Sequence, residues 1–245
     1  MAGWELKAND IVYVGIEVMG DFVERGLSTL RKDIIIISGS FHFGLGAHLP
    51  LATKILDHHH VVALLIHNPP RQLKHNKKLH GFPYGLRDEK SYAVAYDAHP
   101  PLQPRDFVFH SYISKQNNPK ARESIESGPK LLVAEYLQEM ARHQYVLSPN
   151  GDRPDCFRNY EAIGLGTVPI RQEAPKYLTG WMHDAVFNIP TELWNNNSAL
   201  KERLPPYRGT NRQFVLFDYW QKRVEALRDA HINKTLHHMR NASVA

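Results

Sequence analysis

The apolar residues of this chain of 245 residues fall into short runs separated by polar segments. Continuous β-branched or aliphatic runs predict strands that are buried on both faces, as in a parallel sheet. Such runs occupy residues 10–15, 33–38, 61–66, 106–110 and 145–147. Helical segments are predicted over residues 21–30, 51–56, 131–142, 156–165 and 214–228. This alternation of strands and helices predicts an α/β protein with parallel sheets.

The order of these segments predicts two Rossmann-like domains, each a doubly wound parallel sheet. Residues 1–104 carry the first βαβαβ series, residues 105–228 carry the second, and residues 229–245 form a C-terminal helix or tail. Residues 87–104 are polar and rich in proline, and we expect them to form the linker. A chain of this length suits two small domains or one large one.

The amino-acid composition limits the classes of protein to which this chain could belong. No apolar run approaches the ~20 residues that cross a bilayer, and the first ten residues lack the apolar core of a signal peptide. The single cysteine excludes an internal disulfide framework. The net charge of +5 fits a small anionic ligand better than nucleic acid. We expect a cytoplasmic protein, or one of the Golgi lumen if a membrane anchor is missing from this sequence.

The most informative stretch is QYVLSPNGDRPDCFRNYEAIGLGTVPIRQ, residues 144–172. It predicts a strand, a polar loop, a helix with Asp155 as N-cap and Gly166 as C-cap, and a second strand. A helix that begins at the carboxyl end of a parallel strand is a ready anion-binding site. Arg158 and Glu161 are three residues apart and therefore share one face of this helix.

The segment SPNGDRPDCFRNYEAIGLGTVPI resembles the donor-site motif of exostosin-type glycosyltransferases, in which Ser-Pro-x-Gly precedes Asp-Cys-x-Arg, Glu-Ala and Leu-Gly-Thr-x-Pro-Ile. The resemblance implies the GT-B architecture, two Rossmann-like halves facing a central cleft. It also implies transfer of a sugar from a nucleotide diphosphate to a glycan, with inversion at the anomeric carbon. It places Arg158 on the diphosphate and Glu161 on the ribose.

Other candidates for the donor site follow the predicted strands of the second half, and Arg122 is included because the resemblance places an arginine at this point of the chain. They are His110, Ser111, Arg122, Ser148, Pro149, Asn150 and Asp155. Either Tyr112 or Tyr145 could flank the nucleobase, and the sequence leaves this choice open.

The catalytic base is expected in the first half, where the resemblance is looser. KKLHGFPYGL resembles the lysine-rich run and Pro-x-Gly-Leu hinge of the family. VYVGIE and SGSFHFG stand where relatives carry Lys-Thr-Asp and Ser-Gly-x-Ser-Asp, and this sequence departs from both patterns. Glu17 and His42 are the candidates for the base, and we favour Glu17 because the resemblance places a carboxylate there.

No metal or other cofactor is expected beyond the UDP-sugar co-substrate. An Asp-x-Asp triplet, which metal-dependent GT-A enzymes use to hold a divalent ion, is missing from the sequence. The run from Asp57 to His60 is poor ligand geometry, because neighbouring side chains of an extended segment point to opposite faces.

The resemblance implies an inverting transferase that acts on a glycan or glycoprotein acceptor, and the missing triplet favours a metal-independent one. Relatives use UDP-xylose, UDP-galactose, UDP-arabinose, UDP-glucuronate or UDP-N-acetylglucosamine. The compact chain resembles the short exostosin-like enzymes of large algal viruses, so xylose is the first choice. The alternatives are a catalytically silent nucleotide-sugar- or glycan-binding protein of the same fold, and a sugar-nucleotide epimerase.

Overall fold

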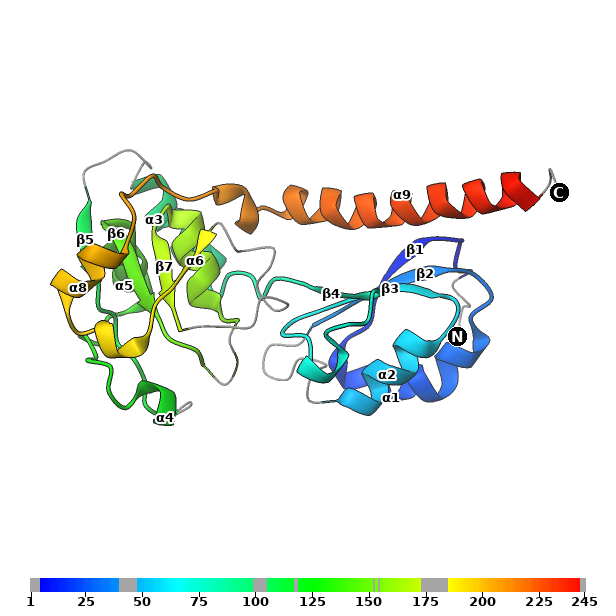
Figure 1. Cartoon of the computed structure of the whole chain (residues 1–245), viewed down its shortest axis with the longest axis horizontal. Helices are drawn as coiled ribbons and strands as arrows, with labels where there is room; N and C mark the ends of the chain where they lie inside the picture. Colours follow the sequence, from blue (N-terminus) through cyan, green and yellow to red (C-terminus); the bar gives the residue numbers. More distant parts are fainter. Residues whose placement is uncertain are drawn as a thin grey trace. The chain divides into compact units, whose positions relative to one another are not determined.

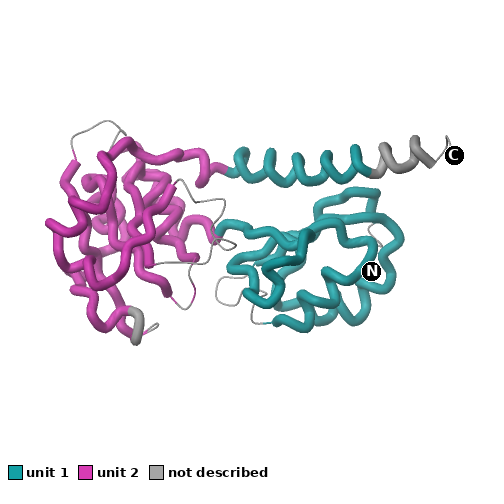
Figure 2. Tube along the Cα trace, viewed as in Figure 1, with its two compact units in different colours: residues 1–83, 217–245 teal, residues 84–216 magenta. Residues whose placement is uncertain are grey.

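A computed structural model describes residues 5–39, 48–98, 105–116, 119–151, 153, 155–172 and 185–242, without the side chains of residues 120, 121 and 235–242. The chain divides into two compact units (Figure 2). Unit 1 comprises residues 1–83 and 217–245, and unit 2 comprises residues 84–216. Each unit contains one four-stranded parallel sheet with helices packed on it. The predicted α/β class with two Rossmann-like units is therefore confirmed.

The sheet of unit 1 runs in the order β1-β2-β3-β4 (Figure 1). Its strands are β1 (Asp10–Tyr13), β2 (Ile34–Ser38), β3 (Val61–Ile66) and β4 (Leu79–Gly81). An irregular helical run, residues 16–29, joins β1 to β2 and includes α1 (Met19–Asp21). Helix α2 (Leu49–Asp57) precedes β3.

Different helices pack on the two faces of this sheet. Ile34 and Ile36 of β2 join the core formed with residues of the first helical run and of α2. Ile35 and Leu65 point to the other face, where Val224 of helix α9 (Phe217–Ala242) completes a second core. Strands that follow one another in sheet order through right-handed connections leave all connecting helices on one face. The returning helix α9 therefore covers the face that these connections leave open.

Unit 2 repeats this plan with the sheet order β5-β6-β7-β8. Its strands are β5 (Asp106–Phe109), β6 (His143–Ser148), β7 (Val168–Arg171) and β8 (Phe187–Asn188). Its helices are α3 (Glu89–Ala98), α4 (Pro119–Arg122), α5 (Val133–Ala141), α6 (Phe157–Leu165) and α8 (Asn197–Arg203).

Strand β6 shows how this second sheet is buried on both faces. Val146 packs in a core with residues of α3, α5 and α6. Tyr145 and Leu147 pack on the opposite face against Trp194 and Leu200, which lie after β8. Tyr145, Val146 and Leu147 are each less than 2% exposed. Such burial on both faces is expected of a strand whose sequence is a continuous apolar run.

Three features differ from the sequence predictions. Neither sheet has the reversed strand order of a doubly wound fold, since both run in chain order. The predicted linker contains α3, whose Tyr92 and Ala95 pack into the core of unit 2. The division after residue 83, and the return of α9 to unit 1, also differ from the expected boundaries at residues 104 and 228. Both boundaries move because a helix packs its apolar side chains on a sheet: α3 joins the core of unit 2, and α9 joins the core of unit 1.

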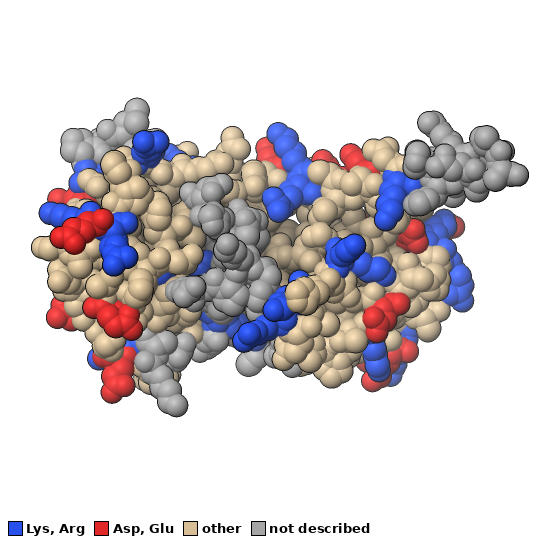
Figure 3. Space-filling view, viewed as in Figure 1, with Lys and Arg blue, Asp and Glu red and all other residues tan. Residues whose placement is uncertain are grey.

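The surface carries charges of both signs. Figure 3 shows basic and acidic side chains interspersed over the visible face of both units. Within the described ranges, no helix combines the length and the apolar character needed to cross a membrane.

Candidate functional site

The candidate site lies at the carboxyl edge of the sheet in unit 2, where ligands bind in open parallel sheets. Helix α6 begins near this edge, after the loop that follows β6. Its N-cap is Cys156, whose backbone is extended (φ −152°) and whose side chain caps no amide. The predicted N-cap, Asp155, lies one residue too early, whereas Gly166 is the C-cap with φ 81°. The first turn of α6 therefore lacks an N-cap side chain on its amides, which favours an anion there.

Asp155 anchors the start of α6 from inside the protein. Its carboxylate accepts a hydrogen bond of 2.6 Å from the Tyr160 hydroxyl and one of 3.4 Å from the Asn159 side chain. Burial raises the pKa of Asp155 to about 6, although these bonds and the charge of Arg171 act in the opposite direction. Asp155 is 5% exposed and Arg171 is fully buried. This arrangement fixes the helix end, and it leaves Asp155 facing the protein interior.

Arg158 and Glu161 are brought together, as predicted, but through a third side chain. The Arg158 Nε atom donates to the Tyr136 hydroxyl at 3.2 Å, and that hydroxyl donates to Glu161 Oε2 at 3.2 Å. Arg158 Nη2 also donates to the Tyr112 carbonyl at 3.3 Å. Among the described residues, Arg158 Nη1 has no hydrogen-bond partner. Arg158 thus keeps a donor for an anion at the start of α6.

Glu161 is 5% exposed, which is unusual for a carboxylate. Burial raises its pKa, against the opposing effects of Arg158, Tyr136 and Arg87. Tyr136 lies within the predicted helical segment 131–142 and is not among the donor-site candidates named from the sequence. A tyrosine at such a position was the one available signal that a polar partner lies nearby.

Asn150, just after β6, is held at this edge by side chains from other parts of unit 2. Arg122 is 8% exposed, and its Nε donates to the Asn150 carbonyl at 2.8 Å while its Nη1 donates to the Ser114 carbonyl at 2.7 Å. The Asn150 amide donates to Gln172 Oε1 at 2.9 Å. Pro149 is buried in the same loop. Arg122 therefore positions the loop through backbone carbonyls.

Two polar atoms at this edge are buried without a partner. They are the hydroxyl of Ser111, after β5, and the Oδ1 atom of Asn150, after β6; neither meets a hydrogen-bonding group among the described residues. Ser148 differs, since its hydroxyl donates to Asn159 Oδ1 at 2.8 Å. Buried polar atoms are nearly always satisfied, so these two favour a ligand at the edge.

The tyrosine proposed to flank a nucleobase can now be chosen. Tyr145 is 1% exposed, and its hydroxyl donates to the Pro205 carbonyl at 2.5 Å within the core, which excludes it. Tyr112 is 45% exposed, adjoins Arg158 through its carbonyl, and has the Lys130 ammonium 5.9 Å from its ring centre. An exposed ring beside an arginine is suited to stacking.

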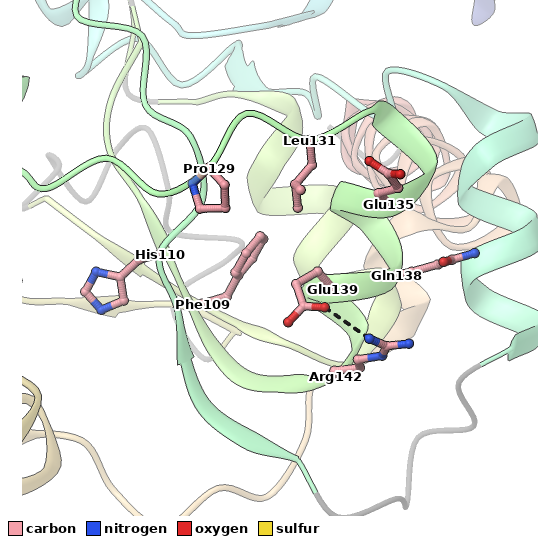
Figure 4. A pocket seen from close by; sticks show the side chains of 8 residues that line it. All are labelled: Phe109, His110, Pro129, Leu131, Glu135, Gln138, Glu139 and Arg142. Atoms are coloured by element: carbon pink, nitrogen blue, oxygen red, sulfur yellow. Dashed lines mark hydrogen bonds and ion pairs between the residues drawn. The ribbon is translucent and has the colours of Figure 1, made fainter.

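His110 lies in a different environment from Arg158. Its Nε2 atom is 3.4 Å from Asn197 Oδ1, and it lines an open hollow of about 410 Å³ between β5 and α5 (Figure 4). The other lining residues are Phe109, Pro129, Leu131, Glu135, Gln138, Glu139 and Arg142. Glu139 pairs with Arg142 at 3.2 Å, and Glu135 accepts from the Leu132 amide at 3.1 Å. The charged groups of this hollow are thus already engaged with neighbours.

The two candidate bases, Glu17 and His42, both belong to unit 1. Glu17 is exposed in the helical turn after β1, and its carboxylate folds back to contact the position that a side chain on Gly15 would occupy. His42 lies outside the described residues.

The histidine run before β3 takes part in an ion-pair cluster. His60 Nδ1 is 2.9 Å from Asp33 Oδ1, and His231 Nε2 of α9 is 3.0 Å from Asp33 Oδ2. In the parts of the chain that the structure describes, no group of three His, Cys, Asp or Glu residues could hold a metal.

No protein-family model matches the chain. No curated protein matches it either. One similar solved structure is described as "Crystal structure of GtfA/B complex", at 12% identity and a TM-score of 0.40. The match covers 91% of this chain and 58% of that chain, so this protein spans little more than half its length. A TM-score this low assigns neither an activity nor a substrate.

Proposed function

We propose that this protein is a glycosyltransferase whose donor, a UDP-sugar, binds at the carboxyl edge of the unit 2 sheet. The observation that carries the proposal is the pairing of Arg158 and Glu161 through Tyr136 at the uncapped start of α6. An arginine and free helix amides suit a diphosphate, and a buried carboxylate suits the two hydroxyls of a ribose. The motif in residues 148–170 resembles that of exostosin-type enzymes at these same residues.

The reaction is a single displacement with inversion. An acceptor hydroxyl forms a bond to the anomeric carbon, the bond from that carbon to the diphosphate oxygen breaks, and a base takes the hydroxyl proton. Arg158 and the α6 amides stabilise the negative charge that grows on the departing UDP, without a divalent metal. We place the base at Glu17 or His42. Xylose is the first choice of sugar, and a glycan or glycoprotein is the acceptor.

A first experiment tests donor binding without relying on activity. Cys156 is the only cysteine and occupies the N-cap position of α6, so the rate of its alkylation by N-ethylmaleimide reports on occupancy of the start of this helix. UDP should slow this alkylation and raise the melting temperature, whereas uridine at equal concentration should do both less. A chain that UDP neither stabilises nor protects at Cys156 does not have this donor site.

A second experiment separates an enzyme from a silent binding protein. The protein is incubated with UDP-xylose and other UDP-sugars, with and without β-linked oligosaccharide acceptors, and released UDP and products are measured by mass spectrometry. We expect acceptor-dependent release of UDP from one donor. UDP binding without transfer or donor hydrolysis would instead identify a nucleotide-sugar-binding protein that has lost catalysis.

A further inference from the structure

We infer that Tyr136 is a positioning residue that couples the two ends of the donor site, so that the diphosphate-binding arginine and the ribose-binding glutamate act as one unit. The inference rests on the proposed function and deepens it. Nothing in the donor motif itself contains Tyr136, because it lies on α5, 22 residues before Arg158.

The hydrogen bonds form a directed chain. A guanidinium can only donate, so the Arg158 Nε group donates to the Tyr136 oxygen; the same hydroxyl then gives its single proton to Glu161. Each bond involves one charged partner, and such bonds are stronger than neutral ones. The Tyr136 hydroxyl therefore restrains a cation and an anion at the same time.

This chain fixes which atoms remain for a ligand. With Nε held by Tyr136 and Nη2 held by the Tyr112 carbonyl, the guanidinium plane of Arg158 is set, and Nη1 is left without a partner among the described residues. Tyr136 also lies under the guanidinium, with 6.0 Å between the Arg158 Cζ atom and its ring centre. At the other end, the Glu161 carboxylate accepts from the Tyr136 hydroxyl and also from the Arg87 backbone amide, which leaves its remaining acceptor positions for a ligand. A flexible arginine would otherwise lose rotamer entropy on binding, so this preorganisation favours affinity.

The helix alone cannot provide this restraint. Arg158 and Glu161 sit on one face of α6, but their long side chains could point in many directions from that face. The restraint comes from α5, whose Leu137 and Met140 are packed in the core of unit 2 and hold Tyr136 in place. The position of α5 against α6 thus sets the distance between the two ends of the donor site.

The test uses the full chain and fragments of the donor. Inorganic pyrophosphate probes the arginine end, uridine probes the glutamate end, and UDP probes both, with binding measured by calorimetry. Tyr136→Phe keeps the ring and removes the hydroxyl. We expect it to weaken UDP binding roughly tenfold or more, since hydrogen bonds to charged groups are the stronger class. It should also weaken both fragments.

The matched control is Tyr145→Phe, which removes another hydroxyl from unit 2, one that bonds only to the Pro205 carbonyl on the opposite face of the sheet. It should bind all three probes as the unmodified protein does. Melting temperatures of both variants show whether each is folded. If Tyr136→Phe binds UDP within about twofold of the unmodified protein, or loses only one fragment, the coupling does not exist.

A crossed measurement detects coupling that mere packing would not produce. Arg158→Lys keeps the charge but loses the Nε donor, and uridine is neutral and binds the other end. We expect Arg158→Lys to weaken uridine binding severalfold, and to have no such effect when Tyr136 is already phenylalanine. An equal effect in both backgrounds overturns the inference. Failure of the unmodified protein to bind UDP would instead overturn the proposed function.

Discussion

Units 1 and 2 share a sheet plan but bury polar groups very differently. Both sheets have four parallel strands in chain order, with apolar side chains on both faces. Of the described buried polar or charged residues, only Ser38 and Asn68 belong to unit 1. The other eight, Ser111, Arg122, Ser148, Asp155, Asn159, Glu161, Thr167 and Arg171, belong to unit 2. Thr167 precedes β7 and bonds backbone carbonyls there, whereas the other seven lie at the carboxyl ends of the strands, in the connections that follow them or on α6. Since burying such groups is costly, their presence makes this edge the candidate site.

The contrast extends to the carboxylates. In unit 2, Asp155 is buried beside Tyr160, and its pKa is raised to about 6. In unit 1, Asp33 is more exposed and lies between His60 and His231; burial opposes its ionisation, but these two partners prevail and its pKa is lowered. The same residue type therefore contributes to stability with opposite dependence on pH in the two units.

The largest effect should come from the packing that both units share. Leu65→Ala in unit 1 and Leu147→Ala in unit 2 each empty a buried site in a central strand. Each should lower the free energy of unfolding by about 2–5 kcal/mol. Urea unfolding followed by circular dichroism measures both. A cost below about 1 kcal/mol for Leu65→Ala would mean that α9 does not cover that face in solution.

The next effect concerns Asp155. Because its folded pKa of about 6 exceeds the ordinary 3.8, the native state binds the proton more tightly, and stability falls as the pH rises through this interval. The total loss should be on the order of 3 kcal/mol. Asp155→Asn should remove this slope in urea unfolding between pH 4 and 7. An unchanged slope in the variant would assign the titration to another group.

The third effect concerns catalysis. Arg158→Ala should lower turnover by about 10²-fold or more, because it removes stabilisation of charge that develops on the leaving group. Arg142→Ala, which removes an exposed arginine paired with Glu139 in the same unit, is the control and should leave turnover unchanged. Steady-state kinetics with the identified donor measures both variants. Equal activities would remove Arg158 from the site.

The smallest effect concerns Asp33. Its pKa is lowered, so the stability it provides is present above about pH 4 and is lost as the pH falls below its ordinary value of 3.8. Its side chain is 36% exposed, and solvent screening limits the contribution to less than about 1 kcal/mol. Asp33→Asn should speed hydrogen exchange in α9 around His231 at neutral pH. Unaltered exchange would show that this ion pair does not hold the helix.

The sequence predicted the central strands of both sheets well, because a strand buried on both faces needs a continuous apolar run, whereas the short edge strands β4 and β8 have no such run. Strand β3 was predicted with its observed bounds, and β2 and β6 within a few residues. Helix α3 was missed because only Tyr92 and Ala95 of its residues are buried, which leaves a faint apolar stripe. The strand order and the return of α9 depend on contacts between residues far apart in the chain, which periodicity does not encode.

The sequence likewise predicted those parts of the candidate site that depend on residues close together in the chain. Arg158 and Glu161 are close in sequence, so helical spacing brought them together. Their link through Tyr136 joins two helices, and the anchoring of Arg122 on the Asn150 carbonyl joins positions 28 residues apart. Asp155 was placed as an N-cap by residue type alone, whereas its contact with Tyr160 turns it inward.

The return of α9 to unit 1 also bears on the order of events during protein synthesis. A ribosome delivers residues 5–83 before unit 2, yet the sheet face that carries Ile35 and Leu65 stays open until Val224 has left the exit tunnel. Unit 2, made from one uninterrupted stretch of chain, has all its core residues before that moment. The segment translated first therefore completes its fold last, with an uncovered apolar sheet for a chaperone to shield in the meantime.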